Sequence, residues 1–274
     1  MTIVKTRDGT NLYVKKWGEG RPVIMMHGWP LSADTFDDMS IAIADAGMQA
    51  ISYDRRGFGR SDQPWDGYTY DALADDLADV MQACNATNAA LVGFSMGGGE
   101  VARYMSRHSG KGVTQAVLIA SVVPYMPQTD DNPNGTPTSV FEDMGAQMRT
   151  DRAEFFTTFF NDFYGVGLLN APVSHEVMEW SRNVAMQASL KATLACAEAF
   201  SATDFRPDLA SFNCPTLIIH GTADRTVPID PSARAAAAGI SGAKLIEYDG
   251  APHGLFATHK DQLAHDVLEF LQQA

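Results

Sequence analysis

The sequence has few cysteines and few basic residues, and these two shortages exclude several classes of protein. Its three cysteines lie far apart and form no C-x-x-C pair, which argues against a disulfide framework and against a zinc site. They are Cys84, Cys196 and Cys214. Only 20 Lys and Arg residues face 33 Asp and Glu residues, so the net charge is −13. Because phosphate binding requires clustered positive charge, we expect neither a nucleic acid nor a membrane surface as partner.

Long apolar segments are missing as well. Residues 1–11 are polar and lack the apolar core of a signal peptide. The longest apolar runs, such as Ala116–Ala120, are far shorter than the roughly 20 residues that a membrane-spanning helix needs. These absences predict a soluble protein of the cytoplasm.

Strand and helix patterns alternate along most of the chain. Short apolar or alternating runs predict strands over residues 2–5, 12–15, 21–26, 49–53, 89–92, 113–120, 215–220 and 244–248. Helical spacing predicts helices over about 35–47, 70–83, 98–109 and 261–271. This alternation is typical of an α/β fold, here a mainly parallel eight-stranded sheet flanked by helices.

The alternation stops in the middle of the chain. Residues 124–138 are rich in Pro, Asn, Asp and Thr, which marks a loop. Only helical patterns follow, over 140–148, 152–163, 174–187 and 189–200, before strand signals resume. The sequence therefore predicts a core made of residues 1–123 and 205–274, with a helical cap, 124–204, inserted into it.

A serine lies on a tight turn between a predicted strand and a predicted helix, in the run Gly93-Phe94-Ser95-Met96-Gly97. G-x-S-x-G in this setting is the nucleophile elbow, where a strained turn and small neighbours let the serine oxygen project clear of the backbone. Ser95 is the candidate nucleophile. The other reading is that Ser95 only caps the helix.

Two further residues complete a candidate triad in the chain order Ser, Asp, His. Asp224 follows the predicted strand 215–220, and His253 follows the strand 244–248. Both sites lie where parallel strands end, at the edge where α/β folds place their ligands. Structural roles remain the alternatives, because a loop Asp often forms a turn and a loop His often lies at the surface.

A tetrahedral intermediate needs two N–H donors for its negative oxygen. One is expected from Met96, the residue after the nucleophile. The other is expected from the loop after the strand 21–26, where Trp29 is the best donor because Pro30 has no N–H. His27 in the same loop is expected to hold the loop rather than act as a base.

No cofactor or metal site is predicted. Gly57-Phe-Gly59 lacks the third glycine of a dinucleotide fingerprint, and Gly97-Gly-Gly99 is not followed by Lys and Ser or Thr. Among the other histidines, His259 and His265 lack the i, i+4 spacing of a helical metal pair. An ionic network rather than an anion site is expected from a cluster in the loop after strand 49–53 (Arg55, Arg56 and Arg60 with Asp54 and Asp62).

Taken together, these motifs resemble the cofactor-free haloperoxidase, perhydrolase and arylesterase branch of the α/β-hydrolase family. The resemblance covers essentially the whole chain. It rests on His27-Gly-Trp-Pro30, Tyr53-Asp-Arg-Arg-Gly-Phe-Gly-Arg-Ser-Asp62, Gly93-Phe-Ser-Met-Gly-Gly-Gly99, Val101-Ala-Arg-Tyr104, Ser189-Leu-Lys-Ala-Thr193, Thr203-Asp-Phe-Arg-Pro207 and Gly250-Ala-Pro-His-Gly254.

The resemblance implies an α/β-hydrolase fold, the triad Ser95, Asp224 and His253, and the oxyanion donors Trp29 and Met96. It also implies hydrolysis of small aryl and alkyl esters. With hydrogen peroxide, such enzymes convert short carboxylic acids into peracids, which oxidise halides without haem or vanadium. A homo-oligomer is implied too. A small pocket is expected between core and cap, with a lining that includes Trp29, Phe94, Met96, Val122, Phe159 and Phe163.

Other functions share this fold. Haloalkane dehalogenases and epoxide hydrolases use a carboxylate nucleophile, so Ser95 argues against both. Lactamases and carbon–carbon bond hydrolases use the same triad, and only substrate assays separate them. A ligand-binding receptor on the same fold is a further alternative, disfavoured by an intact triad.

Overall fold

One sheet organises the computed structural model, which describes residues 2–168 and 170–273. Its eight strands lie in the order β1-β2-β4-β3-β5-β6-β7-β8. They are β1 (Thr2–Lys5), β2 (Asn11–Trp17), β3 (Pro22–Met26), β4 (Gln49–Tyr53), β5 (Ala89–Phe94), β6 (Val113–Ile119), β7 (Thr216–Gly221) and β8 (Lys244–Tyr248). β2 pairs antiparallel with β1 and with β4, and the other described pairs are parallel. The predicted mainly parallel, eight-stranded sheet is confirmed.

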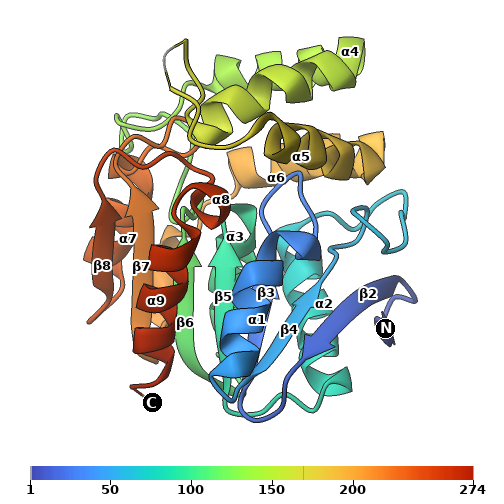
Figure 1. The fold of residues 1–274 in the computed structure, drawn as a ribbon, viewed down its shortest axis with the longest axis vertical. Coiled ribbons are helices and arrows are strands. Elements are labelled where there is room, and N and C mark those ends of the chain that lie inside the picture. Colours follow the sequence, from blue (N-terminus) through green and yellow to red (C-terminus); the bar gives the residue numbers. More distant parts are fainter. Residues whose placement is uncertain (1, 169, 274) are drawn as a thin grey trace.

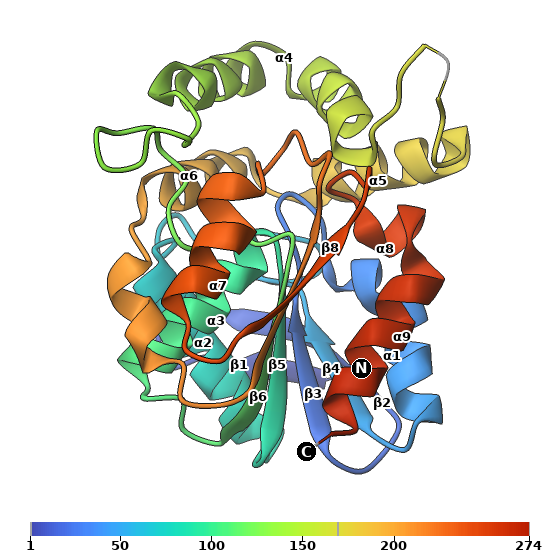
Figure 2. The same ribbon diagram turned by 90° about the vertical axis from the view of Figure 1, so that its left-hand side faces the viewer.

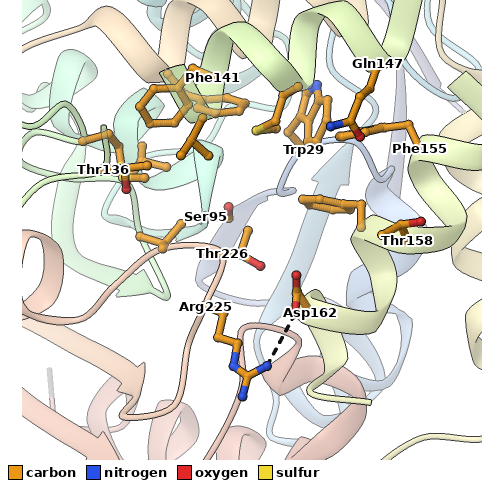
Figure 3. A pocket seen from close by; sticks show the side chains of 17 residues that line it. Trp29, Ser95, Thr136, Phe141, Gln147, Phe155, Thr158, Asp162, Arg225 and Thr226 are labelled. Carbon is orange, nitrogen blue, oxygen red and sulfur yellow. Dashed lines mark ion pairs between the residues drawn. The ribbon is translucent and has the colours of Figure 1, made fainter. Parts of the chain in front are cut away.

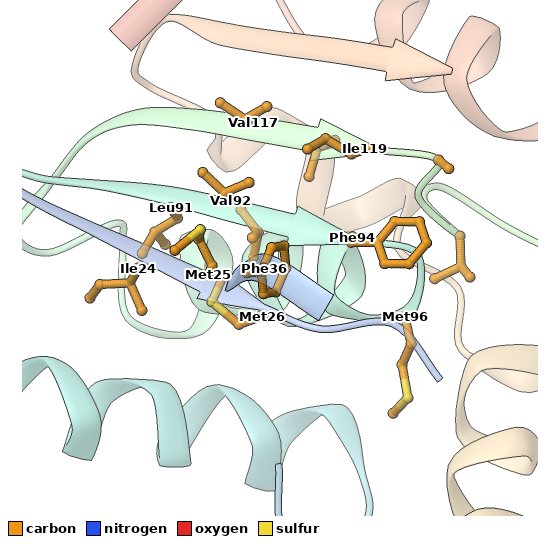
Figure 4. Packing of buried hydrophobic residues seen from close by; sticks show 14 of the residues in the cluster. Ile24, Met25, Met26, Phe36, Leu91, Val92, Phe94, Met96, Val117 and Ile119 are labelled. Carbon is orange, nitrogen blue, oxygen red and sulfur yellow. The ribbon is translucent and has the colours of Figure 1, made fainter. Parts of the chain in front are cut away.

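Helices cover both faces of this sheet, which explains why its central strands are continuously apolar. Every residue of β5 and of β7 is buried. On one face lie α1 (Asp37–Asp45) and α9 (Lys260–Leu271) (Figures 1 and 2). On the other lie α2 (Tyr70–Ala83), α3 (Met96–Arg107) and α7 (Ala235–Gly239). Figure 4 shows apolar side chains of β3, β5 and β6 in the resulting core.

Several helices agree with the sequence pattern, and several short ones do not follow from it. The helix predicted over 70–83 has the same bounds as α2, and Thr69 caps it by accepting a hydrogen bond from the Ala72 N–H at 3.3 Å. The short helices that were not predicted are η1 (Ala33–Phe36), η2 (Arg206–Ser211), η3 (Asp230–Arg234), α7 and α8 (Leu255–Thr258).

Three helices of the middle segment lie over the carboxyl ends of the strands (Figure 1). They are α4 (Thr138–Tyr164), α5 (His175–Gln187) and α6 (Leu190–Ala202). The helix α4 is interrupted at Asp151, whose φ of −152° and ψ of 93° are not helical. There the Asp151 carboxylate accepts a hydrogen bond from the Glu154 N–H at 3.0 Å and caps the second half. This break separates the two helices predicted over 140–148 and 152–163.

None of the helices described in the structure is both long enough and apolar enough to cross a membrane.

Candidate active site

Ser95 lies on a strained turn between β5 and α3. Its φ of 53° and ψ of −117° place a non-glycine residue in a region that costs about 1–3 kcal/mol. The two flanking glycines are required by close packing. A Cβ atom at Gly93 would lie 2.5 Å from the Gly97 carbonyl oxygen, and one at Gly97 would lie 2.1 Å from that of Met26. The G-x-S-x-G pattern is thus explained sterically.

Ser95, His253 and Asp224 come together in one chain of hydrogen bonds. The Ser95 Oγ lies 3.0 Å from the His253 Nε2, and the His253 Nδ1 lies 2.6 Å from the Asp224 Oδ2. The three residues follow β5, β8 and β7, and all are buried. Because Nδ1 faces a carboxylate it carries the proton, which leaves Nε2 free to accept the serine proton.

The Asp224 carboxylate is held by four donors, which are two backbone N–H groups and the rings of His253 and His220. Its Oδ1 accepts hydrogen bonds from the Thr226 N–H at 2.9 Å and from the Val227 N–H at 2.7 Å. Burial alone would raise the pKa of this carboxyl, but the interactions with His253 and His220 outweigh burial and hold its pKa well below the ordinary value. Asp224 is therefore ionised at neutral pH and keeps the His253 ring in one orientation.

His220 is a site residue that the sequence reasoning missed. It lies at the end of β7 and is wholly buried, with Nε2 2.8 Å from the Val227 carbonyl oxygen and 3.2 Å from the Asp224 Oδ2. A carbonyl can only accept, so Nε2 carries the proton and donates to both oxygens. The signal in the sequence is its spacing, four residues before Asp224 on a strand that ends at the site.

Two aromatic rings pack against the imidazole of His253. The ring centroids of Phe163 and Phe94 lie 4.8 Å and 5.2 Å from that of His253. Both side chains are buried and neither lines the cavity in front of Ser95. Met96 is also buried, and its side chain points away from Phe94 (Figure 4). The expectation that Phe94, Met96 and Phe163 line the pocket is corrected, because burial against the imidazole and in the core takes these side chains out of it.

The expected oxyanion donors have free N–H groups. Within residues 2–168 and 170–273, neither the Trp29 N–H nor the Met96 N–H donates a hydrogen bond. The Trp29 indole Nε1 donates to the Thr193 carbonyl oxygen of α6 at 3.0 Å, which fixes the side chain against the cap. Met96 opens α3, so its N–H also lies at the positive end of the helix dipole.

His27 holds the loop that carries Trp29, as expected. Its Nδ1 donates to the Gly28 carbonyl oxygen at 2.9 Å, and its Nε2 accepts from the Arg55 N–H at 3.0 Å. Burial, with a further contribution from the positive charge of Arg55, lowers the pKa of His27 well below its ordinary value. The imidazole is therefore neutral, with a defined tautomer.

The arginines of the loop after β4 do form an ionic network, but mostly with other partners than expected. The pairs are Arg55–Glu100, Arg56–Asp76, Arg56–Asp8, Arg60–Asp54 and Arg60–Asp34. Asp62 instead accepts hydrogen bonds from Asn11. Arg55 also donates to the His27 carbonyl oxygen at 2.5 Å, so its pair with Glu100 of α3 links the Trp29 loop to the helix that follows Ser95.

A cavity of about 250 Å³ opens in front of Ser95, between the strand ends and α4 (Figure 3). Of the predicted lining residues it contains Trp29, Val122 and Phe159. The remaining lining residues are Met126, Thr136, Val140, Phe141, Met144, Gln147, Phe155, Thr158, Asp162, Phe200, Arg225, Thr226 and Val227. The cavity is thus mainly apolar, with Ser95 at its wall, which suits small apolar acyl groups.

A group of potential metal ligands lies on α9. In the described part of the chain, ligand atoms of His265, Asp266 and Glu269 come within 4.8 Å of one another. Asp266 accepts a hydrogen bond from the Tyr248 hydroxyl at 2.5 Å, and none of the three residues lines the cavity. Clusters of this kind on helix surfaces are common without an ion, so this one carries no functional assignment.

Comparison with known proteins places this geometry in a family. A family model described as alpha/beta hydrolase fold matches residues 21–260, and the chain therefore belongs to the α/β hydrolases. Within that family it belongs to the branch of non-heme haloperoxidases and esterase/perhydrolases.

Three proteins illustrate that branch. The chain is 39% identical over 275 residues to a non-heme chloroperoxidase of Kitasatospora aureofaciens, which covers 100% of both chains. It is 40% identical over 276 residues to a bifunctional esterase/perhydrolase of Acinetobacter calcoaceticus, covering 99% of this chain and 100% of the other. The crystal structure of a bromoperoxidase from Bacillus anthracis superposes with a TM-score of 0.96 at 40% identity, covering 99% of each chain.

Proposed function

We propose that this protein is a serine esterase for small aryl and alkyl esters, with perhydrolase activity toward short carboxylic acids. The observation that carries the proposal is the hydrogen-bonded chain from Ser95 through His253 to Asp224, beside a mainly apolar cavity. The names of the relatives, which include an esterase/perhydrolase and non-heme chloroperoxidases, support the same assignment.

In the acylation step, His253 accepts the proton of Ser95 as the serine oxygen attacks the ester carbonyl carbon. The negative oxygen of the tetrahedral intermediate accepts hydrogen bonds from the Trp29 and Met96 N–H groups. Each such donor contributes about 10²–10³ in rate. The intermediate collapses, the alcohol leaves with the proton from His253, and the acyl group stays on Ser95.

In the second step, His253 deprotonates the incoming nucleophile. Water yields the carboxylic acid, and hydrogen peroxide yields the peracid. The acyl-enzyme also forms from a protonated carboxylic acid, with loss of one water molecule. The released peracid transfers one oxygen to a halide ion, which gives hypohalous acid and the carboxylate. No metal or organic cofactor takes part in this scheme.

The division into a core of residues 1–123 and 205–274 and a cap of 124–204 belongs to this proposal. The core supplies the reacting groups, whereas α4 and α6 supply Phe155, Phe159 and Phe200 to the cavity wall. Substrate selection by the cap is the expected consequence. A homo-oligomer and a cytoplasmic location remain predictions from the sequence.

A substrate panel tests the proposal. Purified protein is assayed with p-nitrophenyl acetate and butyrate, with simple lactams, with a carbon–carbon hydrolase substrate, and with acetate plus peroxide. We expect turnover of the esters and peracid formation from acetate. Preferential turnover of a lactam or of the carbon–carbon substrate would replace the esterase assignment, and binding without any turnover would favour a receptor.

A further inference from the structure

The cavity in front of Ser95 has one charged corner. Of its described lining residues, only Asp162 of α4 and Arg225 of the loop after β7 carry charge. Figure 3 shows both on the side of Thr226, opposite the rings of Trp29 and Phe141. The Arg225 Nη1 lies 3.7 Å from the Asp162 Oδ1, and the two side chains are 78% and 61% exposed. An ion pair this long and this exposed contributes little, so the guanidinium is available to another carboxylate.

The backbone that carries Arg225 is firmly held, although its side chain is not. Asp224 precedes it, and the Asp224 carboxylate binds the N–H groups of the next two residues, Thr226 and Val227. The Thr226 Oγ1 is buried and, in the part of the chain that the structure describes, has no hydrogen-bond partner. Arg225, whose backbone is held in place, and Thr226, whose hydroxyl is unpartnered, are therefore neighbours in the cavity lining.

Charge makes this corner important for anionic ligands. The whole protein carries a net charge of −13, which repels carboxylates from its surface. Short carboxylic acids are ionised at neutral pH, as side-chain carboxyls are. A guanidinium binds carboxylates through two parallel N–H groups, and a hydroxyl can add a third donor. A single cation at the cavity offers such ligands a local attraction.

We propose that Arg225, with Thr226, forms a carboxylate-recognition site at the cavity, and that Asp162 is its internal competitor. The site binds a carboxylate, either that of the short acid whose protonated form enters perhydrolysis or that at the far end of an ester. The inference rests on the proposed esterase and perhydrolase function, because it assigns a substrate class to the same cavity. Arg225 and Asp162 are specificity-determining residues and take no part in bond making.

The experiment uses Arg225→Gln and Asp162→Asn, with Lys260→Gln and Asp38→Asn as matched controls. Lys260 and Asp38 also form an exposed ion pair, 3.4 Å long, and neither residue lines the cavity. Each control substitution therefore changes the net charge by as much as its counterpart in the cavity. One arm measures inhibition of p-nitrophenyl acetate hydrolysis by acetate. The second arm compares kcat/KM for monoethyl succinate with that for diethyl succinate.

Arg225→Gln should weaken the carboxylate ligand relative to the neutral ester by about fivefold, the upper range for one exposed charge. Asp162→Asn should strengthen it by about twofold, and added salt should reduce both effects. The arm that responds identifies the source of the carboxylate. If neither arm moves beyond the control variants, or if both cavity variants shift it in the same direction, the recognition site does not exist.

Failure of the proposed function is separable from failure of this inference. Acetate binding to Ser95→Ala protein, followed by ligand-detected NMR, needs no turnover. The same ordering of affinities, with Asp162→Asn above the parent and Arg225→Gln below it, is expected there. A protein that turns over no ester but keeps this ordering loses the esterase assignment alone, whereas an active esterase without it loses the carboxylate site.

Discussion

The two walls of the cavity are built in opposite ways. On the core wall, Ser95 faces the cavity, and the side chains of His253, Asp224 and His220 are buried behind it. These residues form one chain of polar contacts. On the cap wall, the polar lining residues of α4 are exposed and Thr136 is half-buried, and the remaining side chains are apolar (Figure 3). Proton transfer needs fixed distances, whereas accepting different acyl groups needs a surface without demanding partners. We infer from this difference that the chemistry belongs to the core wall and that acyl-chain selection belongs to the cap wall.

The largest effect is expected when the nucleophile of the core wall is removed. Ser95→Ala should reduce ester hydrolysis by at least about 10⁴-fold, because it removes the nucleophile. Thermal stability should change little, since the Ser95 hydroxyl faces the cavity and its one side-chain partner is His253. Initial rates and circular dichroism melting measure both quantities.

Ser106→Ala in the same helix α3 is the matched control and should keep full activity. A fluorophosphonate probe should label the parent and Ser106→Ala proteins but not Ser95→Ala. Near-normal turnover by Ser95→Ala would refute the mechanism.

The next effect separates two phenylalanines one helical turn apart on α4. Phe163 is buried against His253, and the Gly254 N–H donates to its carbonyl oxygen at 2.8 Å. Phe163→Ala should therefore destabilise the protein by about 3–5 kcal/mol and lower kcat. Urea unfolding and steady-state kinetics with one short ester measure these changes.

Phe159 lies on the cavity and is only half-buried. Phe159→Ala should cost less stability and shift acyl-chain preference toward longer acids, because it enlarges the cap wall. Rates with p-nitrophenyl esters of increasing length test this. If the two variants behave alike, the cap does not divide into a supporting side and a selecting side.

One pH effect is expected from buried His27, in the loop that carries Trp29. The pKa of buried His27 lies well below 6.5, so at acid pH the unfolded chain takes up a proton that the folded protein refuses. The contribution of neutral His27 to the free energy of unfolding is therefore fully present above about pH 6.5. As the pH falls below this value, the contribution is lost by about 1.4 kcal/mol per pH unit.

Urea unfolding between pH 8 and pH 5 measures that slope. His27→Gln, which can still accept from the Arg55 N–H, should remove this part of the pH dependence while lowering stability at pH 8. An unchanged slope in the variant would mean that His27 takes up its proton as readily in the folded protein as in the unfolded chain.

The smallest expected effect is none at all. Prolonged treatment with EDTA followed by dialysis should leave both ester hydrolysis and peracid formation unchanged. Among the residues of metal-ligand type at the site, His253 and His220 already bind Asp224, and Asp162 faces Arg225. The group on α9 lies outside the cavity lining. Activity that is lost with the chelator and restored by one metal would contradict the cofactor-free scheme.

Local patterns in the sequence were enough for the fold and for the candidate triad. Strand and helix periods predict eight strands in the observed places, and the turn around Ser95 is readable because its glycines are demanded by contacts within a few residues or with the adjacent strand. Asp224 and His253 follow from the rule that parallel strands end at one edge. Such features can be recognised in short stretches of the chain, so a single sequence is enough to predict them.

The lining of the cavity was decided only by tertiary structure. Phe159 and Phe163 belong to the same helix and have the same chemistry, yet one faces the cavity and the other faces His253. Arg55 pairs with Glu100, 45 residues further along the chain, rather than with a nearby aspartate. The rotation of each helix and the partner of each buried charge are set by packing between distant segments, which periodicity along the chain does not encode.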